Sequence, residues 1–181
     1  MALFKFQNHS AIKNAQNNPR LVATEVIKNG YLFKVEDNYD VEGDGSVILK
    51  EAAVPFADDT EAQGDVWVAF NIVDKPETLN YADFQVEVGE FVRGFNLTKM
   101  HGEIIEVSSD IVDIADPSTI AVGDILIPCN ETDDADNPMH WKVAGELDTG
   151  YAVAMEVIGL TTFGSFTVDA GVGLEVKVKS N

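Results

Sequence analysis

The chain has 181 residues, 45% of them hydrophobic, which is enough for one large or two small domains and excludes a largely disordered protein. It carries 31 acidic and 12 basic residues, and the net charge of -19 disfavours binding to nucleic acids or to anionic membrane surfaces. The single cysteine, Cys129, excludes an intrachain disulfide, and no apolar run reaches the roughly 18 residues that a membrane span needs.

Residues 1–20 form a polar segment, rich in Asn and Gln, that we expect to be an extended N-terminal arm. Its apolar residues include Phe4, Phe6 and Ile12, and aromatic residues are favoured anchors at protein interfaces. Two interpretations stay open, a frayed terminus and an arm that docks on a neighbouring subunit through these three residues. The segment lacks the apolar centre of a signal peptide, so we expect synthesis in a cytoplasm.

Strand signals begin at Leu21 and define a β-rich N-terminal subdomain over residues 21–80. Asn29-Gly30 predicts a hairpin turn, and loss of periodicity among strong β formers predicts a strand buried on both faces at Asp65–Val73. The strands expected here are Val22–Ile27, Tyr31–Val35, Val47–Leu49 and Asp65–Val73. A connection with Pro76 then marks the boundary to a second domain.

Residues 81–181 predict a small β-barrel or sandwich, because strand signals recur at intervals of roughly ten residues. The expected strands are Phe84–Val88, Glu90–Phe95, Gly102–Val107, Asp124–Pro128, Trp141–Ala144, Tyr151–Ile158 and Gly173–Val178. Two of these strands alternate regularly between apolar and polar residues, so each should have one face buried in the core, its dry face, and one face in solvent, its wet face. The dry face of the first strand is Tyr151, Val153, Met155 and Val157, and that of the second is Val172, Leu174, Val176 and Val178.

A repeated phrase, Val-Gly-acid-apolar-apolar, begins at Val88 and again at Val122, and each copy predicts a turn that leads into a buried strand. Helical patterns are limited to single turns. We therefore predict a mainly β chain, an antiparallel β-barrel or sandwich with an extended N-terminal arm and little helix.

One loop fits the spacing of a calcium site, with acids at Asp40, Glu42, Asp44 and Glu51 and glycine at the sixth position. The flanking segments have strand character, whereas such loops normally lie between two helices. An acidic hairpin loop without a specific metal is therefore the expected interpretation, and calcium binding stays open. We predict no metal and no cofactor.

Other catalytic patterns are weak, so we predict that the chain is not an enzyme. His9, His101 and His140 have no second ligand at zinc spacing, and Cys129 is expected to be a buried apolar residue rather than the partner of His140 in a nucleophile pair. The sequence contains no phosphate loop, nucleotide fingerprint or serine elbow.

The stretch from Phe84 to Phe166 resembles small β-rich virion proteins of tailed bacteriophages, most closely head decoration (cement) proteins. The points of likeness are Val88–Phe95, Ala121–Leu126, His140–Val143 and Thr161–Gly164. The resemblance implies a non-enzymatic structural protein and carries over no catalytic residue.

The expected function is binding to the outer surface of an assembled phage capsid, which the chain stabilises by bridging capsid subunits. The expected partners are the major capsid protein and further copies of the chain. The expected location is the capsid exterior of a virion, after synthesis in the bacterial host cytoplasm. Two alternatives stay open, a tail-tube or head–tail connector protein, whose acidic lumen would let DNA slide, and a glycan- or receptor-binding module of a fibre. The second alternative predicts an exposed aromatic loop at Thr161–Phe166.

Overall fold

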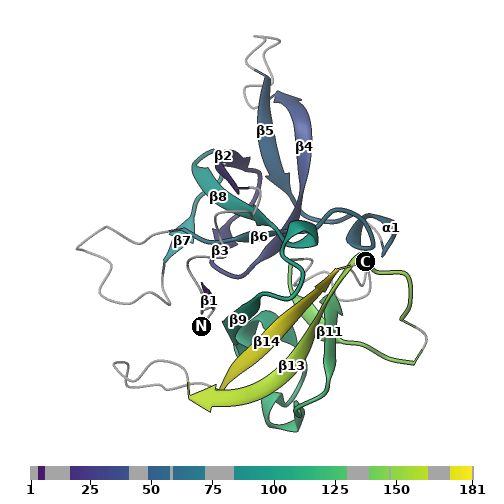
Figure 1. Cartoon of the computed structure of the whole chain (residues 1–181). Coiled ribbons are helices and arrows are strands. Elements are labelled where there is room, and N and C mark those ends of the chain that lie inside the picture. Colours follow the sequence, from purple (N-terminus) through teal and green to yellow (C-terminus); the bar gives the residue numbers. More distant parts are fainter. Residues whose placement is uncertain are drawn as a thin grey trace.

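The structure is a computed structural model, and its architecture confirms the prediction of a mainly β chain, with 52% strand and 11% helix. It consists of a closed five-stranded barrel, a curled seven-stranded sheet and a two-stranded sheet (Figure 1). The described residues are 4–6, 17–40, 49–57, 59–71, 84–129, 139–146, 148–162 and 172–180.

The barrel closes in the order β2-β5-β4-β6-β8, and its strands come from both sides of the boundary predicted near residue 80. Its members are β2 (Asn17–Ala23), β4 (Leu32–Asp40), β5 (Leu49–Val54), β6 (Trp67–Ala69) and β8 (Phe91–Asn96). Only the β2–β5 pair is parallel. A short helix, α1 (Asp59–Ala62), precedes β6.

The barrel interior combines large and small side chains, as a tapering β-barrel requires. Phe33 and Leu21 are fully buried, and Trp67 is nearly so. Ala23, Ala53 and Ala69 fill the narrower positions in the same cluster. The strand expected at Val47–Leu49 is instead β5, which begins at Leu49 and continues to Val54. Ala53 fills the barrel interior, although alanine is a weak strand former.

The second sheet has the order β1-β9-β14-β13-β11-β12-β10 and lies below the barrel in Figure 1. Its strands are β1 (Phe4–Phe6), β9 (Ile104–Ser108), β10 (Val112–Asp113), β11 (Ile125–Pro128), β12 (Trp141–Val143), β13 (Val153–Thr162) and β14 (Val172–Ser180). The remaining pair, β3 (Ile27–Lys28) and β7 (Gln85–Val86), forms the small third sheet.

The two alternating strands pair with each other as β13 and β14, and their dry faces are buried as expected with one exception. Val172 is 39% exposed, so its assignment to the dry face was wrong. It is the first residue of β14 and pairs with Thr162, at the far end of a hairpin that extends beyond its neighbours. Lys177 and Lys179 lie exposed on the wet face.

Both copies of the repeated phrase are turns built by the same hydrogen bonds. Gly89 has φ 85° and Gly123 has φ 102°, the left-handed conformation that the third position of a type II turn needs. In each turn, the carboxylate of the acidic residue accepts a hydrogen bond from the backbone N–H of the first turn residue. Glu90 accepts from Glu87 N at 3.2 Å, and Asp124 accepts from Ala121 N at 2.8 Å. The turns lead into β8 and β11.

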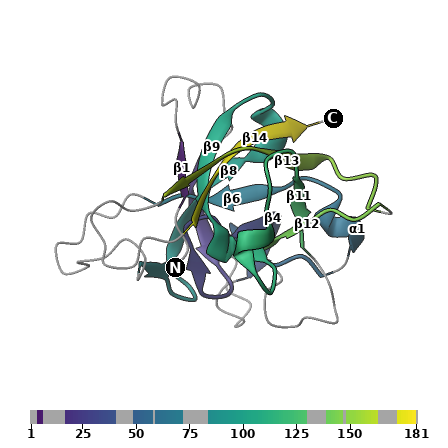
Figure 2. The ribbon, with the colours of Figure 1, turned by 90° about the horizontal axis from the view of Figure 1, so that it is seen from below.

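Barrel and sheet share one hydrophobic cluster, which is separate from the cluster inside the barrel. Leu32 and Val68 of the barrel belong to the same buried cluster as Ile105, Trp141 and Met155 of the sheet. The backbone N–H of Leu32 donates to Met139 O across the junction at 2.7 Å. The view from below shows the sheet strands lying across the barrel strands (Figure 2).

Asp65 joins the ends of two barrel strands through one carboxylate. It accepts from Trp67 Nε1 at 3.1 Å, from Asn96 Nδ2 at 2.9 Å and from Thr98 Oγ1 at 2.7 Å. The last of these lies in a 3-10 helix, η3 (Leu97–Lys99), that follows β8.

Replacing Asp65 with alanine should therefore lower the free energy of unfolding by about 2 kcal/mol, because buried Asn96 and Trp67 lose their acceptor. Urea unfolding followed by tryptophan fluorescence measures the change. Glu25→Ala is the control, since Glu25 lies on an exposed bend with no hydrogen bond to another described residue. Equal stabilities of the two variants would contradict a structural role for Asp65.

Candidate interaction surfaces

The described part of the chain holds no group of three or more His, Cys, Asp or Glu residues that could bind a metal ion. His101 lies exposed at a turn, where its Nδ1 accepts from Ser180 N at 3.0 Å. His9 lies outside the described residues, as does most of the candidate calcium loop. Only Asp40, at the end of β4, and Glu51, exposed on β5, lie within them, so calcium binding stays a hypothesis.

The structure does bring Cys129 and His140 together. The Cys129 backbone N–H donates to His140 O at 2.7 Å, and Cys129 Sγ lies 3.9 Å from Asp113 Oδ2. However, the two side chains are only 3% and 7% exposed, so the geometry gives a substrate no access to the thiol. The arrangement therefore supports a packing role for Cys129 rather than nucleophilic chemistry.

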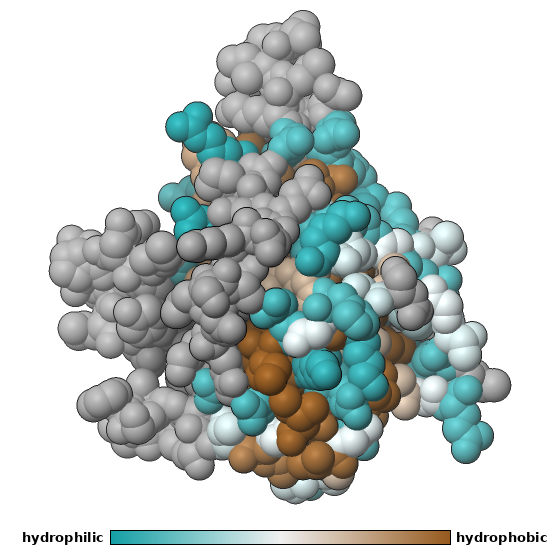
Figure 3. Space-filling view, viewed as in Figure 1, coloured by the Kyte–Doolittle hydropathy of each residue, from teal (hydrophilic) through white to brown (hydrophobic). Residues whose placement is uncertain are grey.

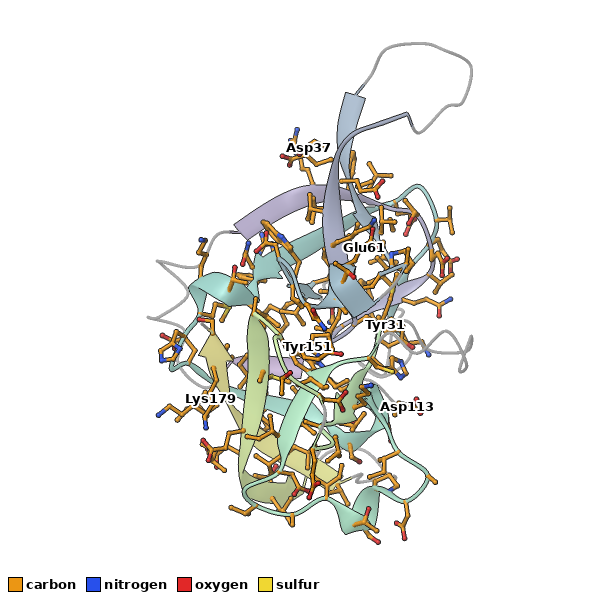
Figure 4. The ribbon with its side chains drawn as sticks, turned by 90° about the vertical axis from the view of Figure 1, so that its right-hand side faces the viewer. Tyr31, Asp37, Glu61, Asp113, Tyr151 and Lys179 are labelled. Carbon is orange, nitrogen blue, oxygen red and sulfur yellow. The ribbon has the colours of Figure 1, made fainter. Side chains whose placement is uncertain are left out.

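His140 lies at the junction of barrel and sheet, and sequence reasoning missed its position. Its ring meets the edge of Tyr31 at a centroid distance of 4.8 Å, and Figure 4 shows Tyr31 and Asp113 in this region. Among the described residues, its Nε2 has no hydrogen-bond partner. Burial, with a smaller effect of the charge on Lys28, lowers the pKa of His140 to about 4.

The N-terminal arm contributes an edge strand to the sheet. β1 pairs antiparallel with β9, with Phe4 opposite Val107 and Phe6 opposite Ile105. Ile12 and the side chains of the two phenylalanines lie outside what the structure describes, so docking of these residues on a neighbouring subunit stays a prediction. The aromatic loop expected at Thr161–Phe166 is likewise described only in its first two residues, at the end of β13.

Large apolar side chains are exposed in two places. The barrel patch consists of Val26, Val88 and Phe91, which are 39%, 63% and 55% exposed. Backbone hydrogen bonds of Ala23 to Gly89 and Glu90 hold the turn between β7 and β8 against the end of β2, close to Val26.

The sheet patch consists of Val122, Leu160 and Val172, which are 61%, 52% and 39% exposed. In the space-filling view, apolar surface gathers over the lower half of the visible face (Figure 3). Such surfaces mark contacts with other molecules more often than single exposed side chains do.

The charged surface is acidic, and several lysines lie in ion pairs. Lys34 Nζ lies 2.7 Å from both Glu36 and Glu61, and these carboxylates raise the pKa of the lysine. Lys179 pairs with Glu156 at 2.8 Å, which lowers the pKa of that glutamate. Paired lysines offer little attraction to phosphate, in keeping with a net charge of -19.

Comparison with protein-family models, curated proteins and solved structures gives no match to this chain. Among the described residues, no helix is long and apolar enough to cross a membrane.

Proposed function

We propose that the chain is a non-enzymatic virion structural protein that binds the outer surface of an assembled phage capsid and bridges its subunits. Three properties support the proposal: the sequence resemblance to decoration proteins, a net charge of -19 that packaged DNA would repel, and a β scaffold with exposed apolar side chains.

The barrel patch is the observation that carries the proposal. Phe91 begins β8 opposite Val22, a residue only 1% exposed, yet Phe91 itself is 55% exposed. Burying Phe91 and Val88 on a neighbouring subunit removes apolar area from water, and large apolar and aromatic side chains dominate interface energies. A protein that binds only the assembled shell stabilises that shell by mass action.

Quantitative mass spectrometry of purified particles from the source phage tests the function. A copy number comparable to that of the major capsid protein is the expected result. A few copies or tens of copies would overturn the capsid assignment and favour the tail-tube or connector alternative. Absence from the particles would overturn the virion proposal and leave the glycan-binding module, which a glycan array tests directly.

Contact through the barrel patch makes a specific prediction for binding to shells that lack the protein. Val88→Ser with Phe91→Ser should weaken binding at least tenfold, because about 1.4 kcal/mol is the least expected from two buried apolar anchors. The control is Val122→Ser in the sheet patch, which has similar exposure. Unchanged binding of the double variant in co-sedimentation would rule out the barrel patch as the contact.

A further inference from the structure

The outer edge of β9 pairs with a short strand, β1. Phe4, Lys5 and Phe6 lie opposite Val107, Glu106 and Ile105. Ile105 and Val107 are fully buried, so the residues of this edge follow the pattern apolar, acidic, apolar. The sequence Phe-Lys-Phe complements this pattern in hydrophobicity and in charge, since opposed residues of an antiparallel ladder are neighbours on one face.

The middle position of the edge favours a cation. Glu106 lies opposite Glu175 of β14 on its inner side, and Thr161 Oγ1 donates to it at 3.1 Å. Like charges opposite each other destabilise a sheet, whereas a lysine opposite a glutamate stabilises it. Lys5 occupies the position opposite Glu106 on the outer side. The chain's own N-terminal sequence is therefore the occupant that this edge fits.

The connection to β1 is long enough to let the strand leave its own molecule. Ten residues lie between Phe6 and Asn17, where β2 begins in the barrel. An extended connection of this length spans roughly 35 Å, enough to reach an adjacent molecule. Because every copy carries the same donor and the same acceptor, the ladder within one chain and the ladder between two chains contain the same contacts.

We propose that β1 is an exchangeable strand, and that when copies of the chain are crowded together the β1 of one copy fills the β9 edge of the next. The partner is a second copy of this chain. The proposal goes beyond attachment to a capsid and does not depend on a virion origin.

Local protein concentration determines whether β1 pairs with β9 of its own chain or with β9 of another copy. A covalent connection of ten residues keeps a chain's own β1 at an effective concentration on the order of millimolar near its β9 edge, so a dilute chain closes on itself. An edge strand of three residues opens without global unfolding, so copies at millimolar or higher local concentration exchange it. Successive head-to-tail exchange then produces rings or open chains of molecules.

Cross-linking between two separately purified variants tests the exchange. In a Cys129→Ala background, one variant carries Lys5→Cys and the other carries Glu106→Cys, the register partner. The variants are mixed at about 2 mM, above the intramolecular effective concentration. They are then treated with glutathione disulfide, which is reduced as the two protein thiols are oxidised. Cross-strand partners lie within the distance that a disulfide spans.

The expected result is a disulfide-linked heterodimer whose yield is at least about fivefold above a control mixture and falls on dilution well below 1 mM. The control mixes Lys5→Cys with Lys179→Cys, an exposed residue of β14 that lies opposite Ala154 and outside the β1–β9 ladder. Equal yields in both mixtures would overturn the exchange.

A single chain carrying both Lys5→Cys and Glu106→Cys completes the test. At about 10 µM it should cross-link within the chain, because β1 then fills its own edge. Failure to do so would overturn the β1–β9 pairing and the proposal with it. Both results are independent of particle copy number, so failure of this proposal and failure of the proposed function are distinguishable.

Discussion

Replacing Gly94 with alanine is expected to lower the free energy of unfolding by about 3 kcal/mol. A Cβ atom at this position would lie 2.7 Å from Leu21 Cδ1, 2.9 Å from Phe33 Cζ and 3.1 Å from Trp67 Cε3. All three neighbours are buried inside the barrel. A closed barrel has no free edge through which they could move apart, so the added methyl group displaces packed side chains from their rotamers.

Two further variants separate overpacking from a general effect of losing glycine. Gly145→Ala is the matched control, because a Cβ atom there would meet only Asp148 Oδ2, at 3.4 Å, and the expected change is within about 0.5 kcal/mol. Leu21→Val removes the closest atom, so in the Gly94→Ala background it should recover about 1 kcal/mol relative to additive effects. Urea unfolding measures the stabilities of the parent, the three single variants and the double variant. A Gly94→Ala variant as stable as the parent would contradict the overpacking argument.

Local patterns predicted the parts of the fold that local physics controls. Alternation placed Val153, Met155 and Val176 in the core, because a strand with one wet face must segregate its side chains. The repeated phrase predicted two turns, since glycine at positive φ followed by an acid that caps the turn is a self-contained structure. The exposure of Val88 within that turn carries no comparable sequence signal.

The pairing order depends on contacts between distant segments, which periodicity does not encode. The barrel closes by pairing β2 with β8, so that Leu21 lies opposite Val92 across 71 positions of sequence. The edge of the sheet is completed by a three-residue strand, Phe4–Phe6, far too short for a periodic pattern. The pairing of Phe4, Lys5 and Phe6 with β9 could not be predicted from the sequence, because nothing in the sequence identifies β9 as the strand that β1 joins.

His140 was equally hidden, because a lone histidine after an acidic loop and a proline resembles a surface residue. The structure places it 7% exposed at the junction, beside Tyr31. Trp141, the next residue, is fully buried, and its Nε1 finds no hydrogen-bond partner in the described part of the chain either. Two adjacent polar groups are thus buried where barrel meets sheet, a cost that the surrounding core must offset.

The burial of His140 predicts that acid destabilises the protein more than its carboxylates alone would. The pKa of this imidazole is about 4 in the folded state, against 6.5 for an ordinary histidine. Between these values the unfolded state binds a proton that the folded state does not, so the stability contribution is complete above about pH 6.5 and is lost as the pH falls towards 4. The loss is at most about 3 kcal/mol, since each pKa unit corresponds to 1.36 kcal/mol.

The His140→Phe variant isolates this contribution, because an aromatic ring keeps the edge contact with Tyr31 while removing the titrating group. Between about pH 6.5 and pH 4, its free energy of unfolding should fall with pH less steeply than that of the parent, by up to one proton or about 1.4 kcal/mol per pH unit. Parallel curves for the parent and His140→Phe would mean that the imidazole takes up its proton inside the folded protein, and that barrel and sheet separate enough at their junction to let water reach it.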